Sequence, residues 1–182
     1  MDHFNYRNGQ LYAEDVSVAE IAASVGTPFY VYSTATLVRH FQLFDDALDG
    51  MDHCICYAMK AASNQAILKT LGNLGAGMDV VSGGEYRRAI SAGIPPEKVV
   101  FSGVGKTLEE ITLALQNGIR QFNVESDSEL EQISSIAASM SKIAPIAIRI
   151  NPDVDAQTHE KIATGKAENK FGIPLSRARE VY

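Results

Sequence analysis

A regular alternation of short apolar runs and helix-patterned stretches, from about residue 54 onward, is the feature that most constrains the fold. The apolar runs are short and bounded by Gly, Pro or Asn, which is typical of buried parallel strands. Their starts lie roughly 20 to 27 residues apart, close to the length of one strand followed by one helix. The alternation therefore predicts successive β/α units around a parallel sheet. The predicted strands cover residues 54–58, 77–81, 99–102, 119–124 and 146–150.

Helix starts are marked by a hydroxyl residue three positions before a glutamate. The pattern occurs at residues 82–85, 107–110 and 126–129, in each case directly after an apolar run. This spacing lets the hydroxyl accept from the third helical amide while the carboxylate accepts from the amide of the cap residue. Three capping boxes are therefore expected at the starts of three helices. The same pattern at residues 17–20 predicts a short helix that ends near Gly26.

Polar residues near the ends of the apolar runs help to choose between an open doubly wound sheet and a closed (β/α)8 barrel, the two architectures that this alternation allows. These residues are Asp79, Ser102, Asn123 and Arg149. In a barrel they would converge at the carboxyl ends of the strands, where the active site lies. Contact of each strand end with solvent is the alternative explanation. We predict a barrel in which Asp79, Ser102 and Arg149 gather with Lys60 at one end of the strands.

The length of the chain determines how much of a barrel it can form. A complete barrel takes about 250 residues, whereas this sequence has 182 residues and five predicted strands. We therefore expect a truncated, partial (β/α)8 TIM barrel of about five parallel strands, an α/β fold formed by residues 33–182. Residues 1–32 would form a separate N-terminal segment with a helix and a strand.

The composition argues against several classes of function. The net charge of −6 and the pI near 5.2 argue against nucleic acid and anionic membranes, which favour basic surfaces. No run approaches the roughly 18 apolar residues of a membrane helix, and the polar N-terminus lacks the apolar core of a signal peptide. Cys54 and Cys56 would share one face of a strand, so a disulfide between them is not expected. We expect a reduced, cytoplasmic protein without a metal site.

Lys60 closes the first predicted strand and is a candidate for covalent chemistry. By strand alternation Cys56, Ala58 and Lys60 share a face, so the lysine follows two small residues toward the barrel mouth. Small neighbours leave room for a ring, and partial desolvation there would favour the neutral amine that imine formation needs. By itself a lysine at a strand end is more often a solvated surface charge. The argument therefore depends on the segments around it.

The segment Tyr57-Ala-Met-Lys60-Ala61 is similar to the cofactor-lysine motif of the alanine-racemase-type barrel decarboxylases, which use pyridoxal 5'-phosphate. Five later segments resemble motifs of the diaminopimelate decarboxylases within that family, and they occur in the family's order. The last two favour this family over its ornithine and arginine relatives. One departure is Ala62, where the family usually has asparagine, and we expect it to have a small effect on cofactor fit. The five segments are residues 77–85, 99–107, 122–126, 149–155 and 164–173.

The resemblance implies roles for particular residues. Lys60 would hold the pyridoxal 5'-phosphate, and Asp79 would lie near that lysine. Ser102 and Arg149 would also belong to the cofactor site. His159, in the long polar stretch after the fifth strand, would lie close to the substrate.

The resemblance also implies a reaction and a partner. The parent enzyme would remove one carboxylate of an amino-acid substrate, meso-2,6-diaminopimelate, to give L-lysine, and it would act as a homodimer. In the family, further cofactor contacts and a second β domain lie in later parts of the chain. The first 32 residues would pair with that domain, and the 182-residue chain alone would not be a competent enzyme.

Three alternatives stay open at this point. The chain could belong to a non-catalytic pyridoxal-phosphate-binding barrel, a carrier or regulator, or to a decarboxylase of the ornithine or arginine type. A nucleotide-binding interpretation rests on residues 105–107, Gly-Lys-Thr, which look like the end of a phosphate loop. That loop needs a glycine five positions before Gly105, and position 100 is valine. The nucleotide-binding interpretation is therefore weak.

Overall fold

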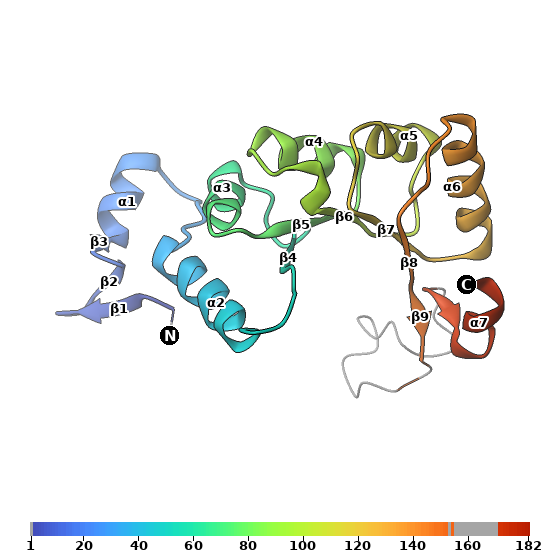
Figure 1. The fold of residues 1–182 in the computed structure, drawn as a ribbon. Coiled ribbons are helices and arrows are strands. Elements are labelled where there is room, and N and C mark those ends of the chain that lie inside the picture. Colours follow the sequence, from blue (N-terminus) through green and yellow to red (C-terminus); the bar gives the residue numbers. More distant parts are fainter. Residues whose placement is uncertain (1, 153, 155–170) are drawn as a thin grey trace.

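The computed structural model describes residues 2–152, 154 and 171–182 (Figure 1). A five-stranded sheet runs through the middle of the molecule. Helices lie in a row along one face of it, and the N-terminal unit lies at one end. The central elements are, in chain order, α2 (Thr34–Ala47), β4 (Cys56–Ala58), α3 (Gln65–Asn73), β5 (Gly77–Val80), α4 (Gly83–Ser91), η1 (Pro96–Lys98), β6 (Val99–Phe101), α5 (Leu108–Gln116), β7 (Gln121–Val124), α6 (Asp127–Ser139) and β8 (Ile146–Ile148).

The central sheet has the order β4-β5-β6-β7-β8, and each neighbouring pair is parallel. The predicted partial (β/α)8 barrel with five parallel strands is therefore confirmed. Each strand follows its neighbour through one helix, so strands that are adjacent in the chain are also adjacent in the sheet. In the described part of the chain, β4 and β8 each have one neighbour in this sheet and form its two edges.

The fifth apolar run does not form one strand, which corrects the prediction for residues 146–150. The Arg149 amide still donates to the Val124 carbonyl at 2.9 Å, but the Arg149 carbonyl accepts from the Ile173 amide at 2.8 Å. The backbone therefore changes its partner at Arg149. Beyond it, β9 (Ile150–Asn151) pairs in parallel with β10 (Ile173–Pro174).

Alternation along the strands separates the two faces of the sheet. One set of side chains packs against the row of helices and forms the hydrophobic core. The rings of Phe101 and Phe122 stack within it, with their centroids 6.2 Å apart. Asp79 and Asn123 alternate with these core residues, so they point away from the helices. The strand side chains that are 0% exposed are Met78, Val80, Val99, Phe101, Phe122 and Val124.

The capping box predicted at the start of α5 is complete. Thr107 Oγ1 accepts from the Glu110 amide at 3.3 Å, and Glu110 Oε2 accepts from the Thr107 amide at 3.0 Å. Glu110 Oε1 also accepts from the Gly83 amide at 2.6 Å, so one carboxylate links the starts of α4 and α5. Desolvation disfavours the charged carboxylate, but these hydrogen bonds outweigh it and lower the pKa of Glu110.

The other two predicted capping boxes are half formed. Ser82 caps α4 by accepting from the Glu85 amide at 3.2 Å, but the Glu85 carboxylate accepts from the amide of Val81, one residue before the cap. Ser126 caps α6 in the same way, by accepting from the Glu129 amide at 3.3 Å. The two serine caps have φ angles of −156° and −157°, against −85° at the cap of α5. The more extended backbone swings the cap amide away from the carboxylate.

The N-terminal segment contains the predicted helix and a small antiparallel sheet. Glu14 Oε1 accepts from Ser33 Oγ at 2.8 Å and from the Ala35 amide at 2.9 Å, which joins this unit to the start of α2. Residues 29–32 lie outside any strand, and their pairing with a further domain stays a prediction, as does the division at residue 32. The elements are β1 (Phe4–Arg7), β2 (Gln10–Ala13), β3 (Val16–Ser17) and α1 (Val18–Val25), and α1 ends at Gly26 as predicted.

The last described residues form η2 (Leu175–Arg177) and α7 (Ala178–Val181). Arg177 Nη1 donates to Asp127 Oδ2 at 2.6 Å and ties this end of the chain to the start of α6. None of the helices in the described ranges has the length and apolar character needed to cross a membrane.

Substitution of Phe122 by alanine tests the core. We expect the free energy of unfolding to fall by about 3–5 kcal/mol, because the 0% exposed ring stacks on Phe101 and its loss leaves a cavity. The matched control is Phe44→Ala, since Phe44 is 56% exposed, and it should cost less than about 1 kcal/mol. Urea denaturation measures both values. Equal losses for the two variants would contradict the assigned core.

Candidate active site

A cavity of about 410 Å³ lies at the carboxyl ends of the sheet strands. Its volume is within the range of roughly 300–1,000 Å³ that small-molecule sites occupy. Each of the five strands contributes to it, either directly or through the residues that follow the strand. Its wall carries an amine, two carboxylates, a hydroxyl, an amide and a guanidinium group. The lining residues are Lys60, Asp79, Ser102, Asn123, Glu125, Ala147, Ile148 and Arg149.

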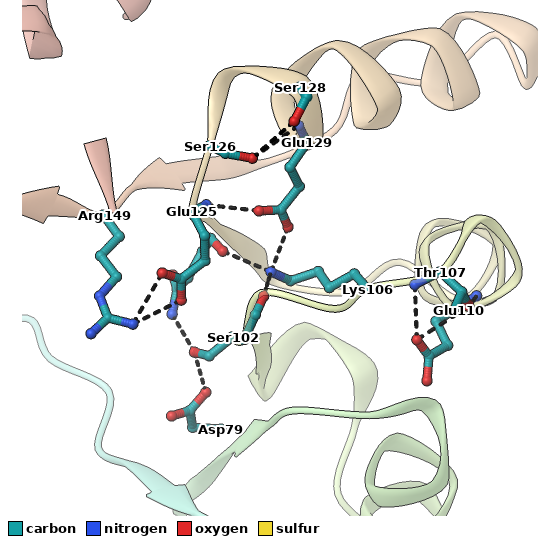
Figure 2. Close-up of polar contacts among 12 residues, drawn as sticks. Asp79, Ser102, Lys106, Thr107, Glu110, Glu125, Ser126, Ser128, Glu129 and Arg149 are labelled. Carbon is teal, nitrogen blue, oxygen red and sulfur yellow. Dashed lines mark hydrogen bonds and ion pairs between the residues drawn. The ribbon is translucent and has the colours of Figure 1, made fainter. Parts of the chain in front are cut away.

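A chain of hydrogen bonds crosses the sheet along the wall of the cavity (Figure 2). Ser102 Oγ donates to Asp79 Oδ1 at 2.5 Å and accepts from Asn123 Nδ2 at 2.8 Å. Asn123 Oδ1 in turn accepts from Gln121 Nε2 at 2.7 Å. The chain joins the ends of β5, β6 and β7, so a shift of one strand would break bonds to the next. These contacts therefore orient the carboxylate, the hydroxyl and the amide relative to one another.

An ion pair forms the other part of the wall. Arg149 Nη1 lies 2.9 Å from Glu125 Oε1 and 3.0 Å from Glu125 Oε2. The Glu125 side chain is 3% exposed, whereas the Arg149 side chain is 39% exposed. The guanidinium carbon also lies 5.3 Å from the centre of the Phe171 ring. The buried carboxylate therefore holds a cation at the mouth of the cavity, where it can still meet a ligand.

Lys60 lies at the same cavity, on the turn that follows β4. The amide of Met59 donates to the Asp79 carbonyl at 3.0 Å, which continues the β4–β5 ladder to the residue before the lysine. We expected Lys60 to be partly desolvated. That expectation is wrong, because the residue is exposed in this structure. The physical reason is that β4 is an edge strand with β5 as its neighbour in the described part of the chain.

The structure brings together the four residues predicted to form the cofactor site, because Lys60, Asp79, Ser102 and Arg149 line one cavity. Their roles toward a cofactor stay predictions. His159 lies outside the described residues. Glu125 was missed as a site residue, although it stands directly after a predicted strand and within segment 122–126.

Asn123 is a polar residue at a predicted strand end, but the resemblance gives it no role in the cofactor site. Its place in the hydrogen-bond chain depends on the neighbouring strand, because its partner Ser102 is 21 positions away in the sequence. Strand alternation is the one sequence signal that could have found it.

The two cysteines are not among the residues that line the cavity. Cys54 Sγ and Cys56 Sγ are 3.8 Å apart and both cysteines are free. Burial raises the pKa of the Cys56 thiol to about 12, with a further contribution from the neighbouring Cys54. Cys56 is therefore a protonated packing residue at neutral pH. Within the described residues, no group of three or more His, Cys, Asp or Glu side chains is arranged to hold a metal ion.

A lysine, an arginine and paired polar groups at the carboxyl ends of barrel strands are the features of a cofactor-binding barrel domain. Comparison with known protein families identifies the domain: the model for the pyridoxal-dependent decarboxylase, pyridoxal binding domain, matches residues 34–182. The chain therefore belongs to the pyridoxal-dependent decarboxylases.

Comparison with individual proteins shows which members of this family the chain is similar to. The chain is 54% identical over 182 residues to the diaminopimelate decarboxylase of Haemophilus influenzae and spans 44% of its length. The crystal structure of diaminopimelate decarboxylase from Helicobacter pylori complexed with L-lysine is 46% identical, with a TM-score of 0.87, covering 90% of this chain and 42% of that one. An arginine decarboxylase of Paramecium bursaria Chlorella virus has a TM-score of 0.72 at 22% identity, covering 90% of this chain and 42% of that one, and shows the shared fold alone.

The residues present fit the family's cofactor, pyridoxal 5'-phosphate. Lys60 supplies an amine at the cavity, which a covalent bond to an aldehyde requires. The cavity has room for a ring, and the guanidinium of Arg149 supplies a cation beside it. Ser102 and Asn123 add neutral hydrogen-bonding groups to the wall. One cavity thus offers an amine for covalent attachment, a cation, and neutral hydrogen-bonding groups that can orient a ligand.

The Arg149–Glu125 pair yields an asymmetric prediction for stability. Arg149→Met should lower the free energy of unfolding by about 2–3 kcal/mol, because it leaves a carboxylate buried without its cation. Glu125→Gln should cost about 1 kcal/mol or less, since the remaining guanidinium is 39% exposed and can be hydrated. Urea denaturation at neutral pH measures both. A larger loss in Glu125→Gln than in Arg149→Met would mean that this account of the pair is wrong.

Proposed function

We propose that the complete protein that carries this chain is a pyridoxal-phosphate-dependent decarboxylase that converts meso-2,6-diaminopimelate to L-lysine. The observation that carries the proposal is the cavity in which Lys60, Asp79 and Arg149 meet, on a chain 54% identical over its whole length to a diaminopimelate decarboxylase. The chain spans 44% of that relative, so the activity is proposed for the complete protein.

The proposed substrate has support from the pattern of similarity. Diaminopimelate decarboxylases match the chain at up to 54% identity, whereas the arginine decarboxylase noted above matches at 22%. The Helicobacter pylori relative was crystallised with L-lysine, the product expected from this substrate. These points favour diaminopimelate over ornithine or arginine. They also favour an enzyme over a non-catalytic pyridoxal-phosphate-binding barrel.

Lys60 would hold the cofactor covalently through Nζ. When bound, pyridoxal 5'-phosphate supplies an electron sink for the negative charge left by loss of the carboxylate. The Lys60 side chain, once released by the incoming substrate, would in its protonated form supply the proton that replaces the carboxylate on that carbon. Its place on a turn at the mouth of the cavity gives Nζ the freedom to serve both purposes.

Asp79, Ser102 and Arg149 would orient the cofactor. Ser102 Oγ donates a hydrogen bond to Asp79 and so keeps that carboxylate in one position in the cavity that Lys60 also lines. The ion pair with Glu125 holds the Arg149 guanidinium in place, so Arg149 would present a cation in a fixed position. Fixed groups of this kind bind a charged ligand with little reorganisation at the moment of reaction.

The remaining parts of the proposal concern partners and location. We propose that His159 lies near the substrate, that the complete enzyme is a homodimer, and that it acts in the cytoplasm on a small amino acid. Support comes from the family and from the acidic composition, with a net charge of −6.

Lys60→Ala in the complete protein tests the central assignment. It should abolish the long-wavelength absorbance of the covalently held cofactor and lower turnover by at least about 100-fold, because both attachment and proton return are lost. The matched control is Lys69→Ala, on the exposed surface of α3, which should keep both properties. Absorbance spectra and released carbon dioxide are the measurements. Retained turnover in Lys60→Ala would rule out the assigned role.

The substrate is tested by a direct comparison. With cofactor added, kcat/KM for meso-2,6-diaminopimelate should exceed that for ornithine or arginine by at least about 100-fold, because a site with polar partners for a second amino-acid group rejects substrates that lack it. Carbon dioxide release from each labelled amino acid measures the ratio. Turnover of ornithine or arginine with diaminopimelate left untouched would contradict the proposed substrate, though not the cofactor.

A further inference from the structure

A buried ion pair lies behind the wall of the cavity, between the β6–α5 connection and α6 (Figure 2). Lys106 Nζ lies 2.6 Å from Glu129 Oε1, and the two side chains are 0% and 10% exposed. Both residues are described, and neither is among those that line the cavity. A buried ion pair is costly unless further hydrogen bonds satisfy both partners. The other contacts of the pair therefore show what it holds in place.

Lys106 directs all three of its donors at protein acceptors. Besides Glu129, Nζ donates to the Gly103 carbonyl at 2.7 Å and to the Asn123 carbonyl at 2.9 Å. An ammonium group has three N–H bonds, so these contacts use its whole capacity. This accounts for Lys106 without a phosphate ligand, which removes the remaining ground for interpreting residues 105–107 as part of a nucleotide-binding loop.

Glu129 uses both of its oxygens. Oε1 accepts from Lys106, and Oε2 accepts from the Glu125 amide at 2.7 Å. The pair therefore holds two backbone groups at the end of β7, the Asn123 carbonyl and the Glu125 amide. Between them stands Val124, which is 0% exposed and packs into the core.

The two residues held by their backbone are the ones whose side chains enter the cavity from β7. Asn123 donates to Ser102 in the cross-strand chain, and Glu125 binds Arg149. Strand alternation puts both side chains on the cavity side while Val124 points to the core. A shift of this backbone by a fraction of an ångström would therefore move both polar contacts together.

We infer that Lys106 and Glu129 are positioning residues of the cofactor site. The buried ion pair holds the 123–125 backbone so that Asn123 can orient Ser102 and Glu125 can hold Arg149 against the cofactor. The identity of the ligand in this inference rests on the proposed function. The backbone contacts rest on the structure alone. Neither residue lines the cavity, so the pair would act through residues that do.

Glu110 provides a matched control. It occupies the same third helical position in α5 that Glu129 occupies in α6, and its carboxylate accepts from two backbone amides, those of Gly83 and Thr107. It forms no ion pair with Lys106, and it does not line the cavity. Glu110→Gln should therefore lower stability without altering the cofactor site.

The experiment uses the complete protein and four variants: Lys106→Met, Glu129→Gln, the double variant Lys106→Met/Glu129→Met, and Glu110→Gln. Three quantities are measured on each: the dissociation constant for pyridoxal 5'-phosphate, hydrogen exchange of the Glu125 amide without cofactor, and thermal stability. The double variant separates positioning from stability. It removes both buried charges while keeping their volume, so stability should return toward that of the unsubstituted protein, but the backbone contacts are lost.

The two single variants should bind pyridoxal 5'-phosphate on the order of 10-fold more weakly, since small misplacements of orienting groups have effects of this size or larger. The double variant should keep this defect and exchange the Glu125 amide faster, although its stability recovers. Glu110→Gln should bind the cofactor within about twofold of the unsubstituted protein and leave the exchange unchanged.

Recovery of cofactor affinity together with stability in the double variant would overturn the inference, because the pair would then matter through stability alone. Unchanged affinity in a folded Lys106→Met or Glu129→Gln variant would overturn it as well. If a single variant does not fold, the double variant decides. Failure of the unsubstituted protein to bind the cofactor would instead refute the proposed function, and the exchange of the Glu125 amide would still test the backbone contacts.

Discussion

Parallel pairing of the five central strands is the constraint on which the rest of the structure depends. When neighbouring strands run the same way, their carboxyl ends meet at one edge of the sheet, and whatever follows each strand is brought there. The helices that return the chain cover one face and bury the alternate side chains, including Phe101 and Phe122. The intervening side chains are then free to be polar. This is why a sheet built for its core also assembles a cavity with Asp79 and Asn123 on its wall.

The polar wall creates its own requirement, because buried polar groups are stable where their hydrogen bonds are satisfied. The structure meets it with two connected systems. One joins Asp79, Ser102 and Asn123 across three strands, and the other runs through the ion pair of Arg149 and Glu125. Both meet at the end of β7. The residues at that strand end must therefore satisfy core packing, hydrogen bonding and an ion pair at the same time.

Much of the fold follows from features that are local in sequence. Each of the five predicted strands was found within one or two residues of its expected bounds, and the fifth ends at Ile148, before Arg149. Hydroxyl caps marked the starts of α4, α5 and α6 because each cap hydroxyl accepts from a helical amide three residues further along the chain. The second half of each capping box was less predictable. It depends on the φ angle of the cap residue, and that angle depends on the direction in which the preceding strand leads into the helix.

The order of elements, the hydroxyl caps and the candidate lysine could be predicted from the sequence, because each depends on residues within a few positions of one another. The sequence also placed Asp79, Ser102 and Arg149 at strand ends through the same short-range pattern. Which side chains form hydrogen bonds and ion pairs with one another was visible only in the tertiary structure. The partners Glu125 and Arg149 are 24 residues apart, and Lys106 and Glu129 are 23 apart. Such pairs form because parallel strands align their ends in space. The number of residues between two positions does not show which side chains will pair there.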